Sequence, residues 1–114
     1  MLARIVWGRI APGKWGEYEA AYKKAIAARG SVAGLTVQWL CRDEADPDAG
    51  YDVSLWETKA ALTAYVGSTE RRDVAEALMP YYVNQFTATH CDVRYLFRSF
   101  PGAKVADPDI YHTN

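Results

Sequence analysis

The order of the predicted elements constrains the fold of this chain more than any other feature. A strand-like run over residues 2–10 precedes a helical stretch, two strand-like runs, a second helical stretch and a last strand, all within residues 1–97. This βαββαβ order is typical of an α+β ferredoxin-like sandwich, in which helices cover one face of a sheet. The other face needs a cover, and a second copy of the chain is the simplest one. We therefore expect one domain, residues 1–97, that pairs as a homodimer.

The spacing of apolar residues along the sequence predicts the positions of the first four elements. Residues 2–10 carry apolar side chains at both parities, which indicates a strand buried on both faces. From Lys14 the apolar positions recur at steps of three and four as far as Gly30, which predicts an amphipathic helix. Alternating apolar and polar side chains predict strands at 35–42 and 51–57.

The remaining elements follow from turn residues. Thr58 is a good N-cap for the second helical stretch, and the Gly-Ser pair at 67–68 predicts that this stretch is broken into two pieces. Residues 92–97 have the composition of a last strand. Residues 98–114 are rich in turn formers and predict a C-terminal tail, either partly disordered or held against a partner subunit by apolar side chains such as Phe100.

Charge and composition exclude several classes of function. The chain has 13 basic and 14 acidic side chains and a net charge of -1, so it carries no basic stripe for nucleic acid and no polybasic segment for a membrane surface. No run approaches the roughly 20 apolar residues of a membrane span. The first residues lack the features of a secretory leader. We therefore expect a cytoplasmic protein with neither nucleic acid nor membrane as a partner.

The chain carries two groups of potential metal ligands. Cys41 and Cys91 fall on the second and fourth strands, at opposite edges of the expected sheet, so we expect neither a disulfide nor a metal motif. The acidic loop 43–50 has some features of a calcium loop. Its glycine stands one place late, however, and Leu55 occupies the position of the final carboxylate, so a solvated hairpin loop is favoured over metal binding.

The sequence contains no familiar catalytic motif. A phosphate-binding glycine loop, a nucleophile elbow and an HExxH helix are all absent from it. Its outstanding feature is its aromatic content, with 4 tryptophans and 8 tyrosines. Aromatic walls suit a flat, apolar ligand, and they also suit an ordinary hydrophobic core.

Two stretches carry a resemblance to a known family: RIAPGK at 9–14, where the first strand passes into a helix, and LWETKAAL at 55–62, which closes the third strand. Over about residues 2–97 the chain resembles the antibiotic biosynthesis monooxygenase family of dimeric α/β barrels. The resemblance implies a homodimer whose sheets face each other as a barrel, with a pocket between sheet and helices in each subunit. Some members oxygenate anthrone-like or quinol-like polyphenols without a cofactor, and others degrade haem.

The cofactor-free members provide one set of expected site residues. The tryptophan that ends their third strand is matched by Trp56, which shares its strand face with Ser54 and Asp52. The family's pocket asparagine is replaced by Asp52, and its pocket tyrosine falls at Leu62. Tyr65 lies one helical turn further on and can supply a phenol from nearby.

The haem-degrading members match less well. Their strand-one asparagine falls at Gly8, their helix tryptophan falls at Tyr65, and no histidine lies between Thr58 and Thr89. The nearest substitute ligand is His90, which we expect to be a partly exposed residue at the start of the fourth strand. We therefore expect a protein without cofactor or metal.

Under the oxygenase hypothesis the candidate catalytic residues are Asp52, Trp56 and Tyr65, of which Trp56 is the one that the resemblance matches directly. An electron-rich phenol reacts with dioxygen once it has lost a proton, so the pocket must bind a flat ring, favour its anion and exclude water. Trp56 packs on the ring in this hypothesis, and Asp52 accepts the proton if burial raises its pKa. The alternative is a structural Asp52 paired with Arg4 or Arg94.

Further residues are candidates for substrate binding: Ser54, Leu62, Asn84 and Arg71. Ser54 and Leu62 follow from the positions just compared. Asn84, with Gln85, can hydrogen-bond a quinone oxygen if the second helix extends that far, or else can cap the carboxyl end of that helix. Arg71 reaches an anionic substituent at the pocket mouth, or else belongs with Arg72 to a solvated face.

Three functions remain open at this point. The first is a cofactor-independent monooxygenase of antibiotic biosynthesis that acts on a small aromatic substrate. The second is a non-oxidative cyclase or isomerase acting on a polyketide-like intermediate. The third is a non-catalytic, stress-related protein that binds a small molecule. One fold hosts all three, so the fold alone does not separate them.

Overall fold

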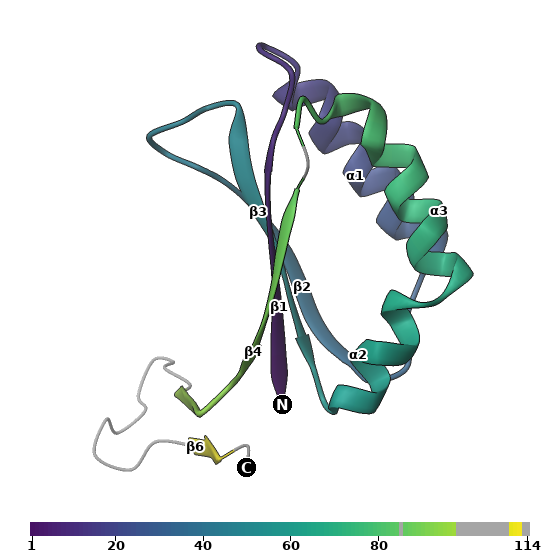
Figure 1. Cartoon of the computed structure of the whole chain (residues 1–114), viewed down its shortest axis with the longest axis vertical. Coiled ribbons are helices and arrows are strands. Elements are labelled where there is room, and N and C mark those ends of the chain that lie inside the picture. The colour runs from purple at the N-terminus through teal and green to yellow at the C-terminus, as the bar shows by residue number, and fades with distance from the viewer. Residues whose placement is uncertain (85, 98–109, 113–114) are drawn as a thin grey trace.

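The computed structural model describes residues 1–84, 86–97 and 110–112, and it confirms the predicted order of elements. The elements are β1 (Leu2–Arg9), α1 (Trp15–Arg29), β2 (Leu35–Arg42), β3 (Ala49–Trp56), α2 (Lys59–Val66), α3 (Thr69–Leu78), the 3₁₀ turn η1 (Met79–Tyr81), β4 (Thr87–Asp92), β5 (Tyr95–Phe97) and β6 (Ile110–His112). Figure 1 shows α1, α2 and α3 on one face of the sheet, with the opposite face uncovered. The chain thus has the predicted α+β ferredoxin-like fold.

The described strands form a four-stranded sheet in the order β2-β3-β1-β4, with antiparallel pairing throughout. The two inner strands align Leu2 with Trp56 and Arg4 with Ser54. Cys41 and Cys91 lie on the two edge strands, as predicted, and both are free and exposed. The short strands β5 and β6 pair separately from this sheet.

Local signals in the sequence set the helix boundaries. α1 ends at Gly30, whose φ of 73° is a left-handed conformation that suits glycine. α2 begins after Thr58, whose side chain accepts a hydrogen bond from the Ala61 N–H. Gly67 ends α2, and Ser68 caps α3 by accepting a hydrogen bond from the Arg71 N–H. The predicted break in the second helical stretch is therefore confirmed.

The fourth strand of the sheet is not where the sequence pattern placed it. We expected residues 92–97, but the strand that pairs with β1 is Thr87–Asp92, while Tyr95–Phe97 pairs with Ile110–His112. The error has a physical reason: Thr87–Asp92 is an edge strand whose residues are all exposed, so it has no apolar alternation to reveal it.

The acidic loop between β2 and β3 is closed by its own side chains. The Asp43 carboxylate accepts hydrogen bonds from the backbone N–H groups of Ala45 and Asp46. The carboxylate of Asp46 also forms an ion pair with Arg9 at 2.6 Å. These carboxylates therefore stabilise the turn, in line with the expected hairpin loop.

Most of the buried apolar residues form two clusters between the sheet and the helices. One contains Ile10, Trp15, Tyr18, Tyr22 and Leu78, and the other contains Trp56, Leu62 and Tyr65. On the uncovered face Val37, Trp39 and Tyr51 are 44%, 41% and 38% exposed. No helix in the described part of the chain is long and apolar enough to cross a bilayer.

Candidate functional site

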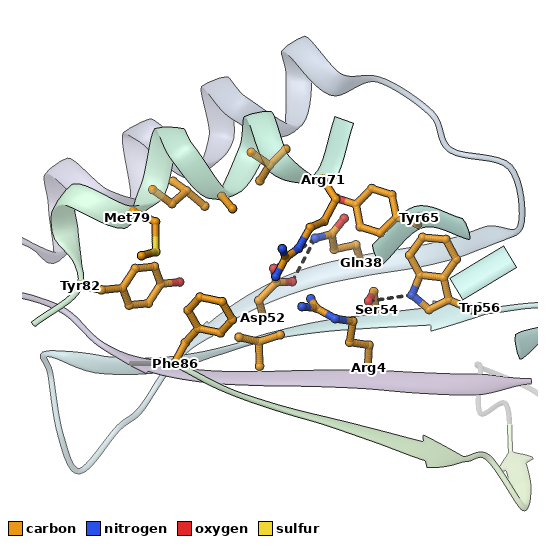
Figure 2. Close-up of a pocket in the computed structure, with 14 residues that line it drawn as sticks. Arg4, Gln38, Asp52, Ser54, Trp56, Tyr65, Arg71, Met79, Tyr82 and Phe86 are labelled. Carbon is orange, nitrogen blue, oxygen red and sulfur yellow. Dashed lines mark hydrogen bonds between the residues drawn. The ribbon is translucent and has the colours of Figure 1, made fainter. Parts of the chain in front are cut away.

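A cavity of about 60 Å³ lies between the sheet and the helices. Its lining residues are Arg4, Val6, Gln38, Asp52, Ser54, Trp56, Tyr65, Arg71, Val74, Ala75, Leu78, Met79, Tyr82 and Phe86. Figure 2 shows that the polar side chains rise mainly from the sheet, whereas α3 contributes most of the opposite wall. The cavity therefore has a polar floor and a largely apolar roof.

Asp52 is the carboxylate of this floor, because the alternation of β3 turns it toward the helices. Gln38 Nε2 donates to Asp52 Oδ1 at 3.0 Å and to Oδ2 at 3.3 Å, and the Tyr22 hydroxyl donates to Oδ1 at 3.1 Å. Burial raises the pKa of Asp52, and the hydrogen bonds from Gln38 and Tyr22 oppose that shift. Among the described residues, Asp52 forms no ion pair with Arg4 or Arg94, so the pairing offered as the structural alternative is not present.

Trp56 forms a fixed aromatic wall at one end of the cavity. Its indole Nε1 donates to Ser54 Oγ at 2.9 Å, and the side chain is 1% exposed. Its ring lies 5.0 Å from the ring of Tyr65, measured between centroids, with an interplanar angle of 31°. Ser54 thus orients Trp56 in this structure, since it satisfies the only hydrogen-bond donor of the indole.

Tyr65 is held by a residue of the first helix. Arg29 Nη1 donates to the Tyr65 hydroxyl at 3.1 Å, and the Arg29 guanidinium lies 5.4 Å from the centroid of the Tyr65 ring. Because the hydroxyl oxygen accepts this bond, its own proton is free to be donated to another oxygen.

Two guanidinium groups enter the same cavity from opposite layers. Arg4 rises from β1 and Arg71 descends from α3, as Figure 2 shows. Arg4 Nε and Gln38 Oε1 are buried atoms with no hydrogen-bond partner among the described residues. Burial lowers the pKa of Arg4, and the positive charge of Arg71 lowers it further.

Tyr82 lines the cavity at the end near η1, and its hydroxyl contacts that of the buried Tyr18. The hydroxyls of Tyr18 and Tyr82 lie 3.0 Å apart, and burial raises the pKa of both phenols. Tyr82 packs over Gly8, where an added Cβ would collide with the tyrosine ring. Gly8 is therefore required by close packing in this structure.

The structure brings together five of the seven residues predicted for the site, which are Asp52, Ser54, Trp56, Tyr65 and Arg71. The other two do not line the cavity. Leu62 is 2% exposed and packs in the cluster of Trp56 and Tyr65. Asn84 is exposed in a neighbouring hollow; it does not cap α3, which ends at Leu78, and Gln85 lies outside the described residues.

Sequence reasoning did not place Arg4, Gln38 and Tyr82 in the site, and it named Arg4 only as a possible ion-pair partner of Asp52. A signal existed for the first two. Arg4 has the same strand parity as Val6, an apolar residue that is buried in the structure, and Gln38 has the parity of the partly buried Leu40. Tyr82 lies beyond a 3₁₀ turn, where no periodicity predicts the direction of a side chain.

The potential metal ligands of the described residues are scattered over the fold. Groups of three or more His, Cys, Asp or Glu side chains in metal-binding arrangement do not occur among them. His90, the substitute haem ligand considered from sequence, is exposed on β4 and does not line the cavity.

The fold and the cavity define a ferredoxin-like α+β domain with a polar and aromatic cavity between its sheet and its helices. The chain matches the antibiotic biosynthesis monooxygenase family over residues 1–77. It therefore belongs to this family. No curated protein matches the sequence significantly.

Solved structures confirm the fold at low sequence identity. A family protein from Bordetella bronchiseptica has a TM-score of 0.71 and 18% identity, and the match covers 78% of this chain and 92% of that one. One from Deinococcus radiodurans has a TM-score of 0.73 and 11% identity, covering 88% and 99%. SnoaB from Streptomyces nogalater, described as a cofactor-independent oxygenase, has a TM-score of 0.70 and 13% identity, covering 88% and 96%.

Proposed function

We propose that this protein is a cofactor-independent monooxygenase that acts on a small anthrone-like or quinol-like aromatic substrate. The observation that carries the proposal is a carboxyl group of raised pKa, Asp52, in a cavity that also presents the ring of Trp56. Family membership and the fold shared with SnoaB support the same reaction class. Asp52, Trp56 and Tyr65 are the proposed catalytic residues.

In the proposed reaction the substrate supplies the electrons. Asp52 accepts a proton from the phenol or from the activated carbon, and the resulting anion reacts with dioxygen. One oxygen atom enters the substrate, and the other leaves as water. For an anthrone, a methylene group becomes a carbonyl, so the atoms balance without a metal or an external reductant.

The surrounding residues have defined parts in this proposal. Trp56 stacks on the substrate ring, while Ser54 and Leu62 hold Trp56 in place by a hydrogen bond and by packing. Tyr65 donates its hydroxyl proton to a substrate oxygen. Asn84 lies in a hollow that shares Met79, Tyr82 and Phe86 with the cavity, so its proposed contact is with a substituent that reaches this hollow.

We further propose that the protein is a homodimer that pairs through the uncovered face of the sheet. Aromatic and β-branched side chains meet on this face, where Trp7 is aligned with Tyr51 and Trp39 with Val53. Apolar patches of this kind are typical of protein interfaces. Light scattering at micromolar concentration should give twice the mass of the chain, and a monomer would contradict the barrel.

A non-oxidative cyclase or isomerase is the second candidate. The observation that favours it is Asp52 itself, because a carboxylate stands where the cofactor-free oxygenases of the family have an asparagine. A partly buried base is sufficient for proton transfer without dioxygen. Product formed from a polyketide-like substrate under anaerobic conditions would favour this candidate. Ligand binding without turnover would favour the non-catalytic alternative.

Dioxygen uptake is the decisive test of the first candidate. The purified protein is assayed with a chelator, without added cofactor, on a panel of anthrones and hydroquinones. We expect uptake above the uncatalysed rate and a fall of about 100-fold or more in Asp52→Asn, the size typical for loss of a general base. Trp56→Phe should lower uptake less, and the exposed Lys23→Gln should not lower it. Absence of uptake across the panel would overturn the oxygenase proposal.

A further inference from the structure

We propose that Arg4 and Arg71 form a subsite for an anionic oxygen, a carboxylate or a phenolate, on an aromatic ligand. The inference uses the cavity assigned above and narrows the class of ligand that it accepts. It does not depend on oxygenation, since it concerns binding alone.

The two side chains differ from the other half-buried arginines of the described chain. Arg9 forms an ion pair with Asp46, and Arg29 donates to the hydroxyl of Tyr65. Among the described residues, the guanidiniums of Arg4 and Arg71 form neither a hydrogen bond nor an ion pair. Since a guanidinium presents five N–H donors, these two groups offer a set of unused donors inside one cavity.

The charges of the cavity also favour an anion. Two guanidiniums and one carboxylate, Asp52, line it, so one positive charge is in excess even when Asp52 is ionised. The Asp52 oxygens are already bound by Gln38 and Tyr22. A buried charge without a partner is costly, and an anionic ligand would remove that cost for Arg4 and Arg71 together. Charge-assisted bonds from arginine to an oxyanion are among the stronger hydrogen bonds in proteins.

The walls of the cavity require that this anion be attached to a ring. Trp56 and Tyr65 form one aromatic end, and Phe86 lies beneath Arg71 with its centroid 6.0 Å from the guanidinium carbon. Apolar side chains of α3 complete the roof. A ligand with an aromatic body and one anionic oxygen would fill the apolar part while its oxygen meets the guanidiniums.

The size of the cavity sets the choice of probe. Cavities that hold drug-sized ligands measure about 300–1,000 Å³. The present cavity of about 60 Å³ is far smaller, so side chains must move when a ligand enters. Long side chains such as Arg71 and Met79 can do so by changing rotamer. A single-ring probe demands the least movement.

The subsite has a chemical consequence for the proposed reaction. Two positive charges beside a phenol oxygen favour its ionised form, so the subsite would lower the pKa of the bound phenol. The proton would then pass more readily to Asp52. The arginines would thus act on the substrate itself before dioxygen is involved.

The test measures binding under anaerobic conditions, where no turnover occurs. Affinities of para-nitrobenzoate and of its neutral analogue para-nitrobenzamide are compared by calorimetry, and the absorbance of para-nitrophenol reports the pKa of the bound phenol. We expect the acid to bind about 10-fold more tightly than the amide, or the phenol to show a lowered pKa when bound. The first result identifies a carboxylate site and the second a phenolate site.

Variants assign the effect to the two arginines. Arg4→Gln and Arg71→Gln should each weaken binding of the anionic probe about 10-fold while amide binding stays the same. Arg4→Lys, which keeps the charge, should restore part of the preference. Arg72→Gln is the matched control, since Arg72 is exposed and outside the cavity. Circular dichroism confirms that each variant is folded.

Equal binding of acid and amide together with an unshifted phenol pKa would overturn the subsite. A preference for the anion that survives both glutamine variants would also overturn it. These outcomes are distinct from failure of the oxygenase proposal, which is judged by dioxygen uptake alone.

Discussion

The face of the sheet beneath the helices encloses Arg4, Gln38 and Asp52, whereas the opposite face leaves Val37 and Trp39 in solvent. In most proteins polar side chains face the solvent and large apolar side chains lie inside. Each face therefore carries groups that are unfavourable where they lie, and these groups differ between the two faces. The covered face has polar groups that a ligand would satisfy, and the uncovered face has apolar area that a second subunit would bury. The difference links the two proposals to opposite faces of one sheet, with the ligand on the covered face and the second subunit on the uncovered face.

Alternation along β3 produces this contrast. Asp52, Ser54 and Trp56 turn toward the helices, and the residues between them turn the other way. A shift of register by one residue would exchange the two sets. The cavity and the proposed subunit interface are therefore fixed by the same strand pairing.

Removal of the indole on the covered face should have the largest effect. Trp56→Ala is expected to lower the free energy of unfolding by about 3–5 kcal/mol, because a fully buried side chain leaves a cavity. Urea denaturation followed by circular dichroism measures it. Trp56→Phe is the control and should cost less. A loss below about 1 kcal/mol would mean that the covered face is not tightly packed.

A charge on the uncovered face should disrupt the proposed dimer while leaving the fold intact. Trp39→Asp is expected to weaken dimerisation about 30-fold or more, the effect of losing an interface hot spot of about 2 kcal/mol. Sedimentation velocity measures the dissociation constant. Ala28→Asp, on an exposed helix position, should leave it unchanged. Equal dimer affinity in both variants would remove the contrast between the two faces.

The hydrogen bond between Ser54 and Trp56 should have a smaller effect on stability. Ser54→Ala is expected to cost about 1–3 kcal/mol, because it leaves the indole Nε1 buried without an acceptor. The cost should largely vanish in a Trp56→Phe background, which has no such donor. An unchanged cost in that background would show that Ser54 stabilises the fold in another way.

The pH dependence of Asp52→Asn should be the smallest effect on stability, since asparagine keeps an oxygen for Gln38 and Tyr22. Burial raises the native pKa of Asp52, so the native state holds this proton more tightly than the unfolded state. Ionisation of Asp52 then destabilises the wild type as pH rises above the ordinary carboxyl range and through the raised native pKa.

Asparagine lacks this ionisation. The melting temperature of Asp52→Asn minus that of the wild type should therefore increase from acidic to neutral pH. The exposed Asp73→Asn serves as the control and should show no comparable trend. A difference that falls with rising pH would mean that the native state favours ionised Asp52.

Much of the fold was predictable, because strand parity and helix caps are local signals. The break after Gly67, the end of α1 at Gly30 and the bounds of β2 all follow from residues within a few positions. β4 was not predictable in this way. Its position depends on pairing with β1, which is distant in the sequence, and its exposed residues leave no pattern.

The candidate site likewise contains residues that a local pattern predicts and residues that only tertiary packing brings in. Asp52, Ser54 and Trp56 share one strand, so alternation alone gathers them. Arg4 comes from another strand and Arg71 from another layer, and their meeting depends on how helix and sheet pack. Leu62 was expected at the cavity because the resemblance matches it with the family's pocket tyrosine, but in the structure it packs in the core with Trp56 and Tyr65.

The break between α2 and α3 determines which side chain of α3 faces the cavity. Ser68 fixes the start of α3 by accepting from the Arg71 N–H at 3.2 Å. Each residue added to or removed from a helix turns the following side chains by about 100°. Because Val74, Ala75 and Leu78 lie on the same helix, an insertion or deletion in this first turn would turn them away from the cavity together with Arg71. The length of this one turn therefore controls both the charge and the apolar roof of the cavity.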